Sequence, residues 1–332
     1  MKSPSPILHA ALLLCGLWSF PIMADSTEAE RALSKGARAN ITLRVIDQDE
    51  RPVSGANVFV YFTLADSPEN SVSGTTDTGG LFTAEKLCTS TCRWTVSKPN
   101  YYATSGSHAF SANVMASTVK NGCWQPWGQT LTVVLKEKRE PVSPVVKRID
   151  LEIPAYGTEV GFDLEKGDWL APHGTGQNAH VFFTLFEEYK DRANQKQELA
   201  LRFPDNDCGV IREKQDAYSE LQTAYAAPLD GYAQTLTLAW EGLAGKKVMD
   251  NRLAPDDYLI FRFKTGSDAP NVEPAFRYGT LCGALDFSPG LPNARRLWFT
   301  YCLNPQANDR NLEFKKPHVS SISDSTKGIT PH

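Results

Sequence analysis

Four side chains that could bind a metal ion or transfer a proton are close together in the middle of the sequence. They are Asp163, Asp168, His173 and His180, which fall within eighteen residues. Carboxylate and imidazole groups serve both kinds of chemistry, but a metal site needs at least three ligands that converge in space. This spacing secures no such set, so we interpret the segment as a loop whose aspartates cap turns. We predict no metal and no cofactor, and keep Asp168 and His173 as candidate binding residues.

Two tryptophans suggest a different kind of site. Trp124 and Trp127 flank Gln125 and Pro126, and two indole rings held around a proline could form a platform for a sugar. An aromatic face attracts the C–H groups on one side of a pyranose ring. The alternative is an edge loop that packs one indole into a domain interface. Trp169 is a further candidate near the same junction, because it lies close to Pro172.

Cysteine usage predicts disulfides. Cys15 lies in the apolar N-terminal run, which leaves six cysteines, and an even number is typical of disulfide-bonded exported proteins. Strands over 276–287 and 296–303, folded about Pro292, would place Cys282 opposite Cys302 at the short separation that a disulfide requires. We predict that pair. Further pairs are expected among the remaining cysteines, which are Cys88, Cys92, Cys123 and Cys208.

The N-terminus has the pattern of a secretory signal peptide over residues 1–24. Lys2 precedes an apolar run over 7–20, and Ala24 supplies a small residue before the expected cleavage point. The run is too short to span a bilayer comfortably. We therefore predict an exported protein, periplasmic or extracellular, with no transmembrane segment in the mature chain.

Length and charge exclude some classes of protein. A chain of 332 residues is expected to form about two domains, and 41% hydrophobic with 22% charged residues is ordinary for a globular protein. The formal net charge is -4, and we find no basic stripe of the kind that nucleic-acid binding uses. No nucleophile elbow and no protease-like pairing of cysteine and histidine is present, so we favour a protein that is not an enzyme.

Strands with alternating apolar side chains account for most of the chain. Ile41, Leu43 and Val45 alternate with polar residues, which places one face of a strand in a core and the other toward water. We predict an all-β protein of two β-sandwich domains, the first Ig-like or prealbumin-like and the second a larger sandwich or jelly roll. The expected boundaries are a flexible lead-in or short helix over 25–39, a first sandwich over 40–137, a proline-stiffened linker over 138–147, a second sandwich over 148–316 and a disordered tail over 317–332.

In the second domain the expected strands are 149–153, 160–164, 180–186, 198–203, 235–240, 258–263, 276–287 and 296–303. Residues 213–227 are the one helix candidate, with a long loop as the alternative because the segment lacks a clear apolar stripe.

The first domain carries a recognisable succession of motifs. They are Val45-Ile46-Asp47, Pro52-Val53-Ser54-Gly55-Ala56-Asn57-Val58, Thr76-Asp77-Thr78-Gly79-Gly80-Leu81-Phe82 and Trp94-Thr95-Val96-Ser97-Lys98. This succession resembles carboxypeptidase regulatory-like (prealbumin-type) domains and the related bacterial Ig-like modules, over about a third of the chain. The resemblance implies a non-catalytic accessory, stalk or adhesion module. The sequence departs from the family at Glu50-Arg51, where a glycine usually precedes the proline, and at the turn between Cys88 and Cys92.

The remainder, especially residues 161–176, is similar to exported bacterial proteins with the same two-part layout, and this similarity brings no activity with it. We therefore predict an exported, non-enzymatic binding or structural protein of the cell envelope, whose partner is a protein or a glycan. The alternative is a carbohydrate-binding accessory protein, or a metal-dependent hydrolase with its site in the loops of the second domain.

Overall fold

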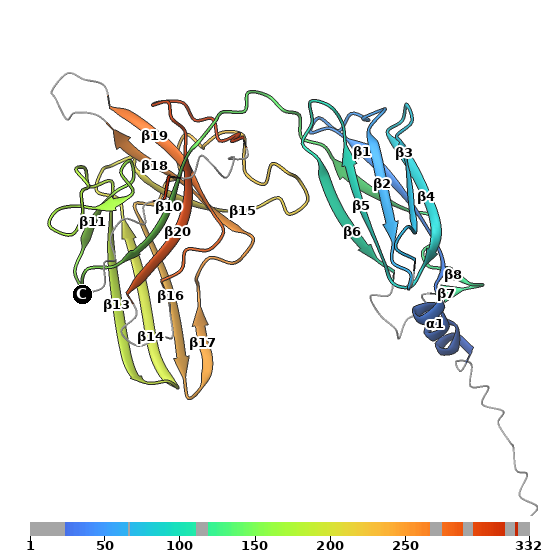
Figure 1. Ribbon diagram of the computed structural model, residues 1–332, viewed down its shortest axis with the longest axis horizontal. Coiled ribbons are helices and arrows are strands. Elements are labelled where there is room, and N and C mark those ends of the chain that lie inside the picture. Colours follow the sequence, from blue (N-terminus) through green and yellow to red (C-terminus); the bar gives the residue numbers. More distant parts are fainter. Residues whose placement is uncertain are drawn as a thin grey trace, which may run out of the picture. The chain divides into compact units, whose positions relative to one another are not determined.

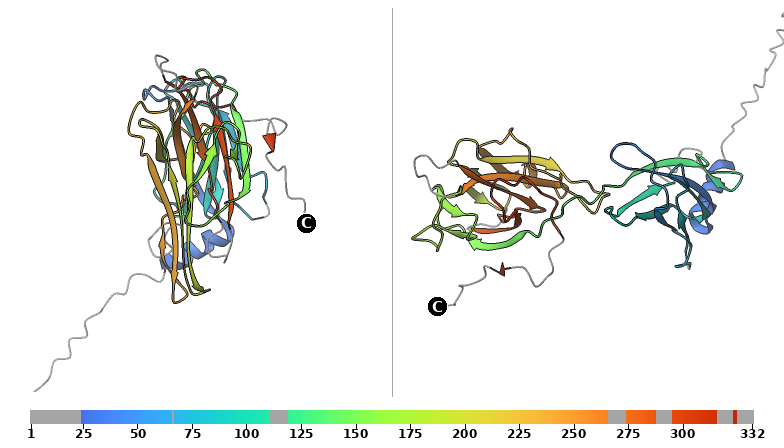
Figure 2. Two further views of the ribbon diagram at one scale, coloured as in Figure 1. Left: turned by 90° about the vertical axis from the view of Figure 1, so that its left-hand side faces the viewer. Right: turned by 90° about the horizontal axis from the view of Figure 1, so that it is seen from above.

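The computed structural model describes residues 24–65, 67–110, 119–265, 274–287, 295–315 and 323–324. Strands make up most of these residues, so the predicted all-β sandwich class is confirmed. Contacts divide the chain into two units. Unit 1 comprises Met1–Ser97 and Ser105–Val133, and unit 2 comprises Lys98–Thr104 and Val134–His332. The elements are labelled in Figure 1 and seen from two other sides in Figure 2. The predicted signal peptide lies outside the described residues, except for Ala24.

The segment expected as a lead-in is largely helical. Helix α1 spans Ala24–Lys35. Ala29 and Ala32 are buried on it, and the side chain of Glu28 accepts the backbone N–H of Gly122 at 2.7 Å. Of the two forms expected for this segment, a flexible lead-in or a short helix, the structure contains the helix. The helix packs beside β7 (Val119–Lys120) in unit 1 (Figure 1).

Unit 1 is built from two sheets. One has the order β4-β1-β8-β7, with β9 also paired to β1, and the other has the order β3-β2-β5-β6. The alternation predicted for the first strand is present, because Ile41, Leu43 and Val45 are all fully buried. The remaining strands are β1 (Ala37–Ile46), β2 (Asn57–Phe62), β3 (Ser71–Thr75), β4 (Leu81–Cys88), β5 (Thr91–Ser97), β6 (Thr104–Ala109), β8 (Cys123–Trp124) and β9 (Gln129–Val134).

Unit 2 contains two six-stranded sheets. Their orders are β15-β18-β19-β20-β10-β21 and β12-β11-β13-β14-β16-β17. Phe299 of the first sheet packs 6.2 Å from the rings of both Phe162 and Phe183 of the second, so aromatic side chains join the layers. The strands are β10 (Val145–Glu152), β11 (Val160–Asp163), β12 (Asp168–Trp169), β13 (Val181–Asp191), β14 (Asn194–Arg202), β15 (Gly209–Lys214), β16 (Thr235–Leu243), β17 (Lys246–Asp250), β18 (Asp257–Thr265), β19 (Ala275–Cys282), β20 (Arg296–Leu303) and β21 (Ser323–Asp324).

The register predicted for Cys282 and Cys302 is wrong at the cysteines. Cys302 lies opposite Thr280, so Cys282 is two positions away from the residue that faces Cys302. Nearer the loop, the isolated bridge between Asp286 and Trp298 has the predicted register. Between these two pairs of residues the segment after β19 contains two more residues than the facing part of β20, which shifts the register by two. Gly283 lies in this irregular part and adopts a φ of 86°. Within the described residues, no disulfide links Cys88, Cys92, Cys123 or Cys208.

Three other segments differ from expectation. Residues 213–227 contain no helix, because β15 continues to Lys214 and the Asp216 side chain then caps a turn by accepting the N–H groups of Tyr218 and Ser219. Part of the segment expected as a linker is bound to unit 2, since Val142 exchanges backbone hydrogen bonds with Glu313 and Lys315. In the tail that we expected to be disordered, Ser323–Asp324 pairs in parallel with β10. The rest of that tail lies outside the described residues.

Within the described ranges, no helix has both the length and the apolar character needed to cross a bilayer.

Candidate functional site

The loop that follows β11 brings together two of the four side chains singled out for metal or proton chemistry, Asp163 and His180. Asp163 is 1% exposed, and both of its carboxylate oxygens accept backbone N–H groups. Oδ1 accepts from Glu165 and Lys166 at 2.9 and 3.0 Å, and Oδ2 accepts from Gln177 and Asn178 at 2.9 and 3.1 Å. The carboxylate therefore closes the loop on itself, as predicted for a turn-capping aspartate.

His180 completes this arrangement without acting as a proton donor to it. Its Nδ1 lies 3.3 Å from Oδ1 of Asp163 but accepts the backbone N–H of Leu164 at 3.0 Å. A ring nitrogen that accepts a hydrogen bond cannot donate one at the same time. The four backbone N–H groups, and not the imidazole, thus satisfy the Asp163 carboxylate.

The other two side chains of the loop do not join Asp163 in a site. Asp168 Oδ2 accepts both the N–H and the hydroxyl of Thr175 at 2.8 Å, so this carboxylate also caps a turn. His173 is exposed. Among the residues that the structure describes, no group of three or more His, Cys, Asp or Glu side chains could hold a metal ion. The loop therefore gives the metal-dependent hydrolase alternative no geometric support.

Two of the three candidate tryptophans belong to the cores. Trp124 is 1% exposed, stacks on Phe110 with ring centroids 6.1 Å apart, and donates from Nε1 to the carbonyl of Cys88 at 2.7 Å. Trp169 is 3% exposed and donates from Nε1 to the carbonyl of Glu152 at 3.0 Å. With both ring faces covered, neither indole can stack on a ligand. The two-indole platform is therefore not formed.

Trp127 is the tryptophan that remains accessible. Its side chain is 40% exposed, and the guanidinium of Arg38 lies over the ring at 5.4 Å from the ring centroid. This is the distance range of a cation–π contact. Successive side chains of a strand point to opposite faces, and Trp124 of β8 points into the core. The chain leaves the strand after Trp124, and Trp127 stays at the surface.

The polar groups beside Trp127 are fixed by one carboxylate. Arg38 and Asn40 are next-but-one neighbours on β1, so they share its outer face, and Glu85 lies directly opposite Asn40 on β4. Glu85 accepts from Nε of Arg38 at 2.9 Å and from Nδ2 of Asn40 at 3.1 Å. Hydrogen bonding to Arg38 holds the pKa of Glu85 below its ordinary value, so the carboxylate stays ionised. We call Arg38, Asn40, Glu85 and Trp127 the Trp127 surface.

This surface has an aromatic ring next to donors and acceptors in defined positions. Arg38 carries five N–H donors, and within the described residues those on Nη1 have no acceptor. On the same sheet face, the hydroxyls of Thr42 and Thr83 lie 2.9 Å apart and are exposed. Alternation along β1 predicts that Arg38 and Asn40 share a face. The position of Glu85 opposite them depends on strand pairing, which the sequence pattern does not fix.

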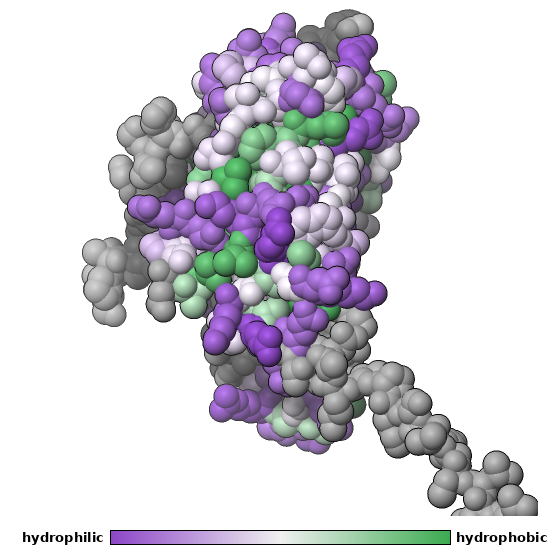
Figure 3. Space-filling model, turned by 90° about the vertical axis from the view of Figure 1, so that its right-hand side faces the viewer, coloured by the Kyte–Doolittle hydropathy of each residue, from purple (hydrophilic) through white to green (hydrophobic). Residues whose placement is uncertain are grey.

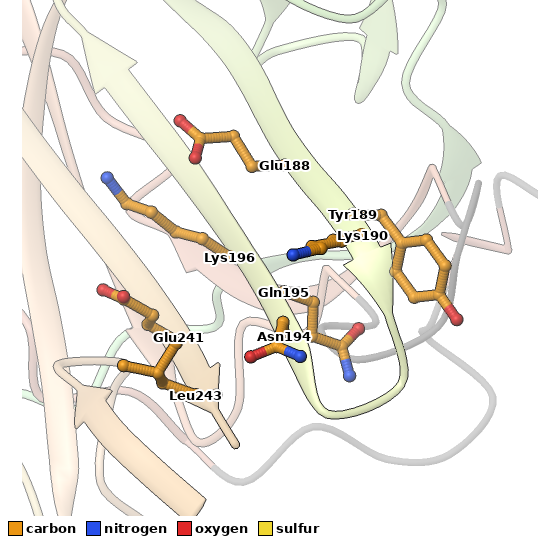
Figure 4. Close-up of a pocket in the computed structure, with 9 residues that line it drawn as sticks. Glu188, Tyr189, Lys190, Asn194, Gln195, Lys196, Glu241 and Leu243 are labelled. Atoms are coloured by element: carbon orange, nitrogen blue, oxygen red, sulfur yellow. The ribbon is translucent and has the colours of Figure 1, made fainter. Parts of the chain in front are cut away.

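Unit 2 has a charged hollow on one sheet. It has a volume of about 370 Å³ and is open on the face of β13, β14 and β16. Glu188, Lys196 and Glu241 lie in register on these neighbouring strands, and Figure 4 shows their side chains on one side with Lys190, while Tyr189 and Gln195 point the other way. Opposite charges in directly facing positions stabilise strand pairing. Pairing between the strands therefore accounts for the row of Glu188, Lys196 and Glu241 without a ligand.

Exposed apolar side chains are scattered. In Figure 3 the hydrophobic groups on the visible face are divided by hydrophilic ones. The exposed members in unit 1 include Phe59, Leu81 and Leu87, at 47%, 41% and 47% exposure. Single apolar side chains of this kind are normal on soluble proteins and do not by themselves indicate an interface.

Comparison with known proteins shows no family. No family model matches the chain, and no curated protein matches it. Solved structures that resemble part of it include a 3-chlorocatechol 1,2-dioxygenase from Rhodococcus opacus (10% identity, TM-score 0.25) and a catechol 1,2-dioxygenase mutant from Acinetobacter radioresistens (15% identity, TM-score 0.25). The match covers 31% and 33% of this chain, and 61% and 55% of theirs.

A third structure is the dioxygenase domain of a dioxygenase carbohydrate-binding protein fusion from Streptomyces sp. SirexAA-E. It is 12% identical with a TM-score of 0.24, over 31% of this chain and 82% of that chain. Likeness at these scores says nothing about the chemistry of the present protein.

Proposed function

We propose that this is an exported, non-catalytic binding protein of the cell envelope, and that unit 1 binds glycans through the Trp127 surface. The observation that carries the proposal is the exposed Trp127 indole beside Arg38 and Asn40, both held by Glu85. Export is supported by the N-terminal pattern of Lys2 followed by an apolar run and Ala24.

A glycan fits this surface for two physical reasons. The C–H side of a sugar ring can lie on the part of the indole that Arg38 leaves uncovered, because the aromatic face is weakly negative. The hydroxyls of the sugar can then accept from the guanidinium of Arg38 and donate to the side-chain oxygen of Asn40. A few polar groups in fixed positions beside an apolar contact are what orient a small ligand.

The ligand is expected to be a glycan chain more than a single sugar. The polar face of the sheet continues from Asn40 to the exposed Thr42–Thr83 pair, where two hydroxyls lie 2.9 Å apart. Since side chains two residues apart on a strand lie about 7 Å from one another, this face offers contacts to successive sugar rings.

Replacing Trp127 with alanine is expected to weaken glycan binding at least about tenfold, because a buried aromatic anchor commonly contributes more than about 1.4 kcal/mol. The mature chain is first tested on a glycan array, and the affinity for the best glycan is then measured by titration calorimetry for wild type, Trp127→Ala and Trp127→Phe.

Phe59→Ala is the matched control, because Phe59 is a similarly exposed aromatic residue on the other sheet of unit 1, at 47% exposure. It should leave the affinity unchanged, and Trp127→Phe should retain part of it. If the wild type binds nothing on the array, or if Trp127→Ala binds as well as wild type, the proposal is wrong.

Glu85→Gln tests whether Glu85 positions the other groups. Glutamine retains the size of the side chain but replaces the charge-assisted bond to Arg38 with a weaker one. We expect glycan affinity to fall about threefold to tenfold while the melting temperature changes little, since the pair is largely exposed. An unchanged affinity in the same calorimetric titration would show that Glu85 does not position the groups that bind the glycan.

A further inference from the structure

We infer that a recess in unit 2 binds a small organic anion with an aromatic body. The recess has a volume of about 250 Å³. It is lined by Tyr102, Lys138, Pro141, Glu220, Leu221, Phe314 and Lys315. These residues come from four stretches of unit 2 that meet at this point. The inference is independent of the glycan proposal.

The walls of the recess are apolar. Leu221, Pro141 and Phe314 contribute hydrocarbon surface. Tyr102 contributes its ring, because its hydroxyl is already committed as a donor to the Glu313 carboxylate at 3.0 Å. Burial and this hydrogen bond both raise the pKa of the Tyr102 hydroxyl, so the ring stays neutral. A recess of this kind favours a ligand with an apolar, ring-shaped body.

The charges around the recess favour a carboxylate. Two of its lining side chains are lysines, and within the described residues neither Lys138 nor Lys315 forms an ion pair with a carboxylate. The Nζ of Lys138 lies over the Tyr102 ring, 5.3 Å from the ring centroid. The one carboxylate in the lining is that of Glu220, which already accepts the N–H of Ala103 at 3.4 Å. A bound anion would thus meet two ammonium groups and one carboxylate, so positive charge is in excess among the lining side chains.

The size of the recess sets the size of the ligand. A cavity of about 150 Å³ already accommodates benzene. The recess therefore has room for one aromatic ring with a short acidic substituent. An ammonium group at its edge could donate to the carboxylate while the ring lies against Leu221 and Phe314, which combines an apolar contact with a charge-assisted hydrogen bond.

Phenylacetate is a suitable probe, and 2-phenylethanol is its uncharged counterpart of similar size. Titration of the mature chain, followed by nuclear magnetic resonance and calorimetry, is expected to give a dissociation constant of about 1 mM for phenylacetate, as ligands of this size reach. Binding of 2-phenylethanol should be at least about fivefold weaker, because the alcohol cannot pair with an ammonium group.

Variants locate the binding. Lys138→Gln and Lys315→Gln should each weaken phenylacetate binding about threefold, and the double variant about tenfold, without affecting 2-phenylethanol. Both lysines are exposed, so the fold should tolerate the changes. Lys190→Gln, in the charged hollow of Figure 4, is the matched control and should bind like wild type.

Three results would overturn the inference. The first is that phenylacetate does not bind up to about 10 mM, tenfold above the expected dissociation constant. The second is that the acid and the alcohol bind equally well. The third is that Lys190→Gln and Lys138→Gln lose the same affinity for phenylacetate. None of these results bears on the glycan proposal, which concerns unit 1.

Discussion

Replacing Asp163 with alanine is expected to lower the free energy of unfolding of unit 2 by about 3–5 kcal/mol. The carboxylate is 1% exposed and accepts four backbone N–H groups. Its removal leaves these partly buried donors without their acceptor, and an orphaned donor costs up to about 1–3 kcal/mol. Part of that cost is offset because a charge no longer has to be buried. Urea unfolding followed by tryptophan fluorescence measures the change, since Trp169 lies in the core beside this loop.

Asparagine at position 163 is the informative comparison. Its side-chain oxygen can still accept, but its NH₂ group would face two backbone donors, so we expect about half of the loss seen with alanine. Asp191→Ala serves as the control, because Asp191 also caps a turn by accepting from Ala193 at 2.8 Å but is exposed at the end of a hairpin. If Asp163→Ala and Asp191→Ala destabilise unit 2 equally, the buried carboxylate does not hold the loop together.

The stabilisation from Asp163 should disappear in acid. Burial acts to raise the pKa of the Asp163 carboxyl, but the hydrogen bonds that it accepts lower it by more, so its net pKa lies well below the ordinary value. A carboxyl with a lower pKa in the folded state contributes its full stability above the unfolded value of about 3.9 and loses it as the pH falls below that value. The difference between wild type and Asp163→Ala should therefore be constant from about pH 7 to pH 5 and shrink toward pH 3. A difference that grows in acid would contradict this sign.

The strands were predictable because the alternation of side chains is a local property. Ile41, Leu43 and Val45 are read as one buried face from the sequence, and they are buried in the structure. The turn-capping role of Asp163 was predictable for the same reason, because aspartate in a glycine-rich loop bonds to nearby backbone.

Side-chain exposure and pairing over long distances were not predictable. Trp124 and Trp127 have equivalent positions around Pro126 in the sequence, and only the path of the folded chain puts one in the core and the other at the surface, at 1% and 40% exposure. The register at Cys302 depends on an irregularity at Gly283, which two long apolar runs do not reveal. Glu85 joins Arg38 across 47 residues, so it could not be assigned before strand pairing was known.

The contacts of the proline-containing segment after residue 137 could not be predicted from the sequence either. Its composition predicts an extended linker, but nothing in it indicates that distant groups hold its backbone. Glu313, which is 1% exposed, accepts the N–H groups of Arg139 and Glu140 at 2.9 and 2.8 Å, and the Tyr102 hydroxyl at 3.0 Å. One carboxylate therefore joins three stretches of unit 2 that are far apart in the sequence.

Replacing Glu313 with alanine is consequently expected to destabilise unit 2 by about 3 kcal/mol, because one buried hydroxyl and two partly buried amides lose their acceptor. The loss should also be local. Hydrogen exchange of the Arg139 and Glu140 amides should accelerate before global unfolding does, since these amides are then released without the sheets opening. Native-state exchange measured by nuclear magnetic resonance distinguishes the local effect from the global one.

Tyr102→Phe separates the contribution of the hydroxyl from that of the carboxylate. It removes one donor but leaves Glu313 bonded to both amides, so it should cost about 1 kcal/mol and leave their exchange slow. Tyr218→Phe is the matched control, because Tyr218 is 62% exposed, and it should have no effect. If Tyr102→Phe accelerates exchange as much as Glu313→Ala does, the Tyr102 hydroxyl and not the carboxylate alone holds the segment, because phenylalanine retains the ring. If neither does, the carboxylate does not anchor the segment, and the recess beside it would lack a fixed wall at Lys138 and Pro141.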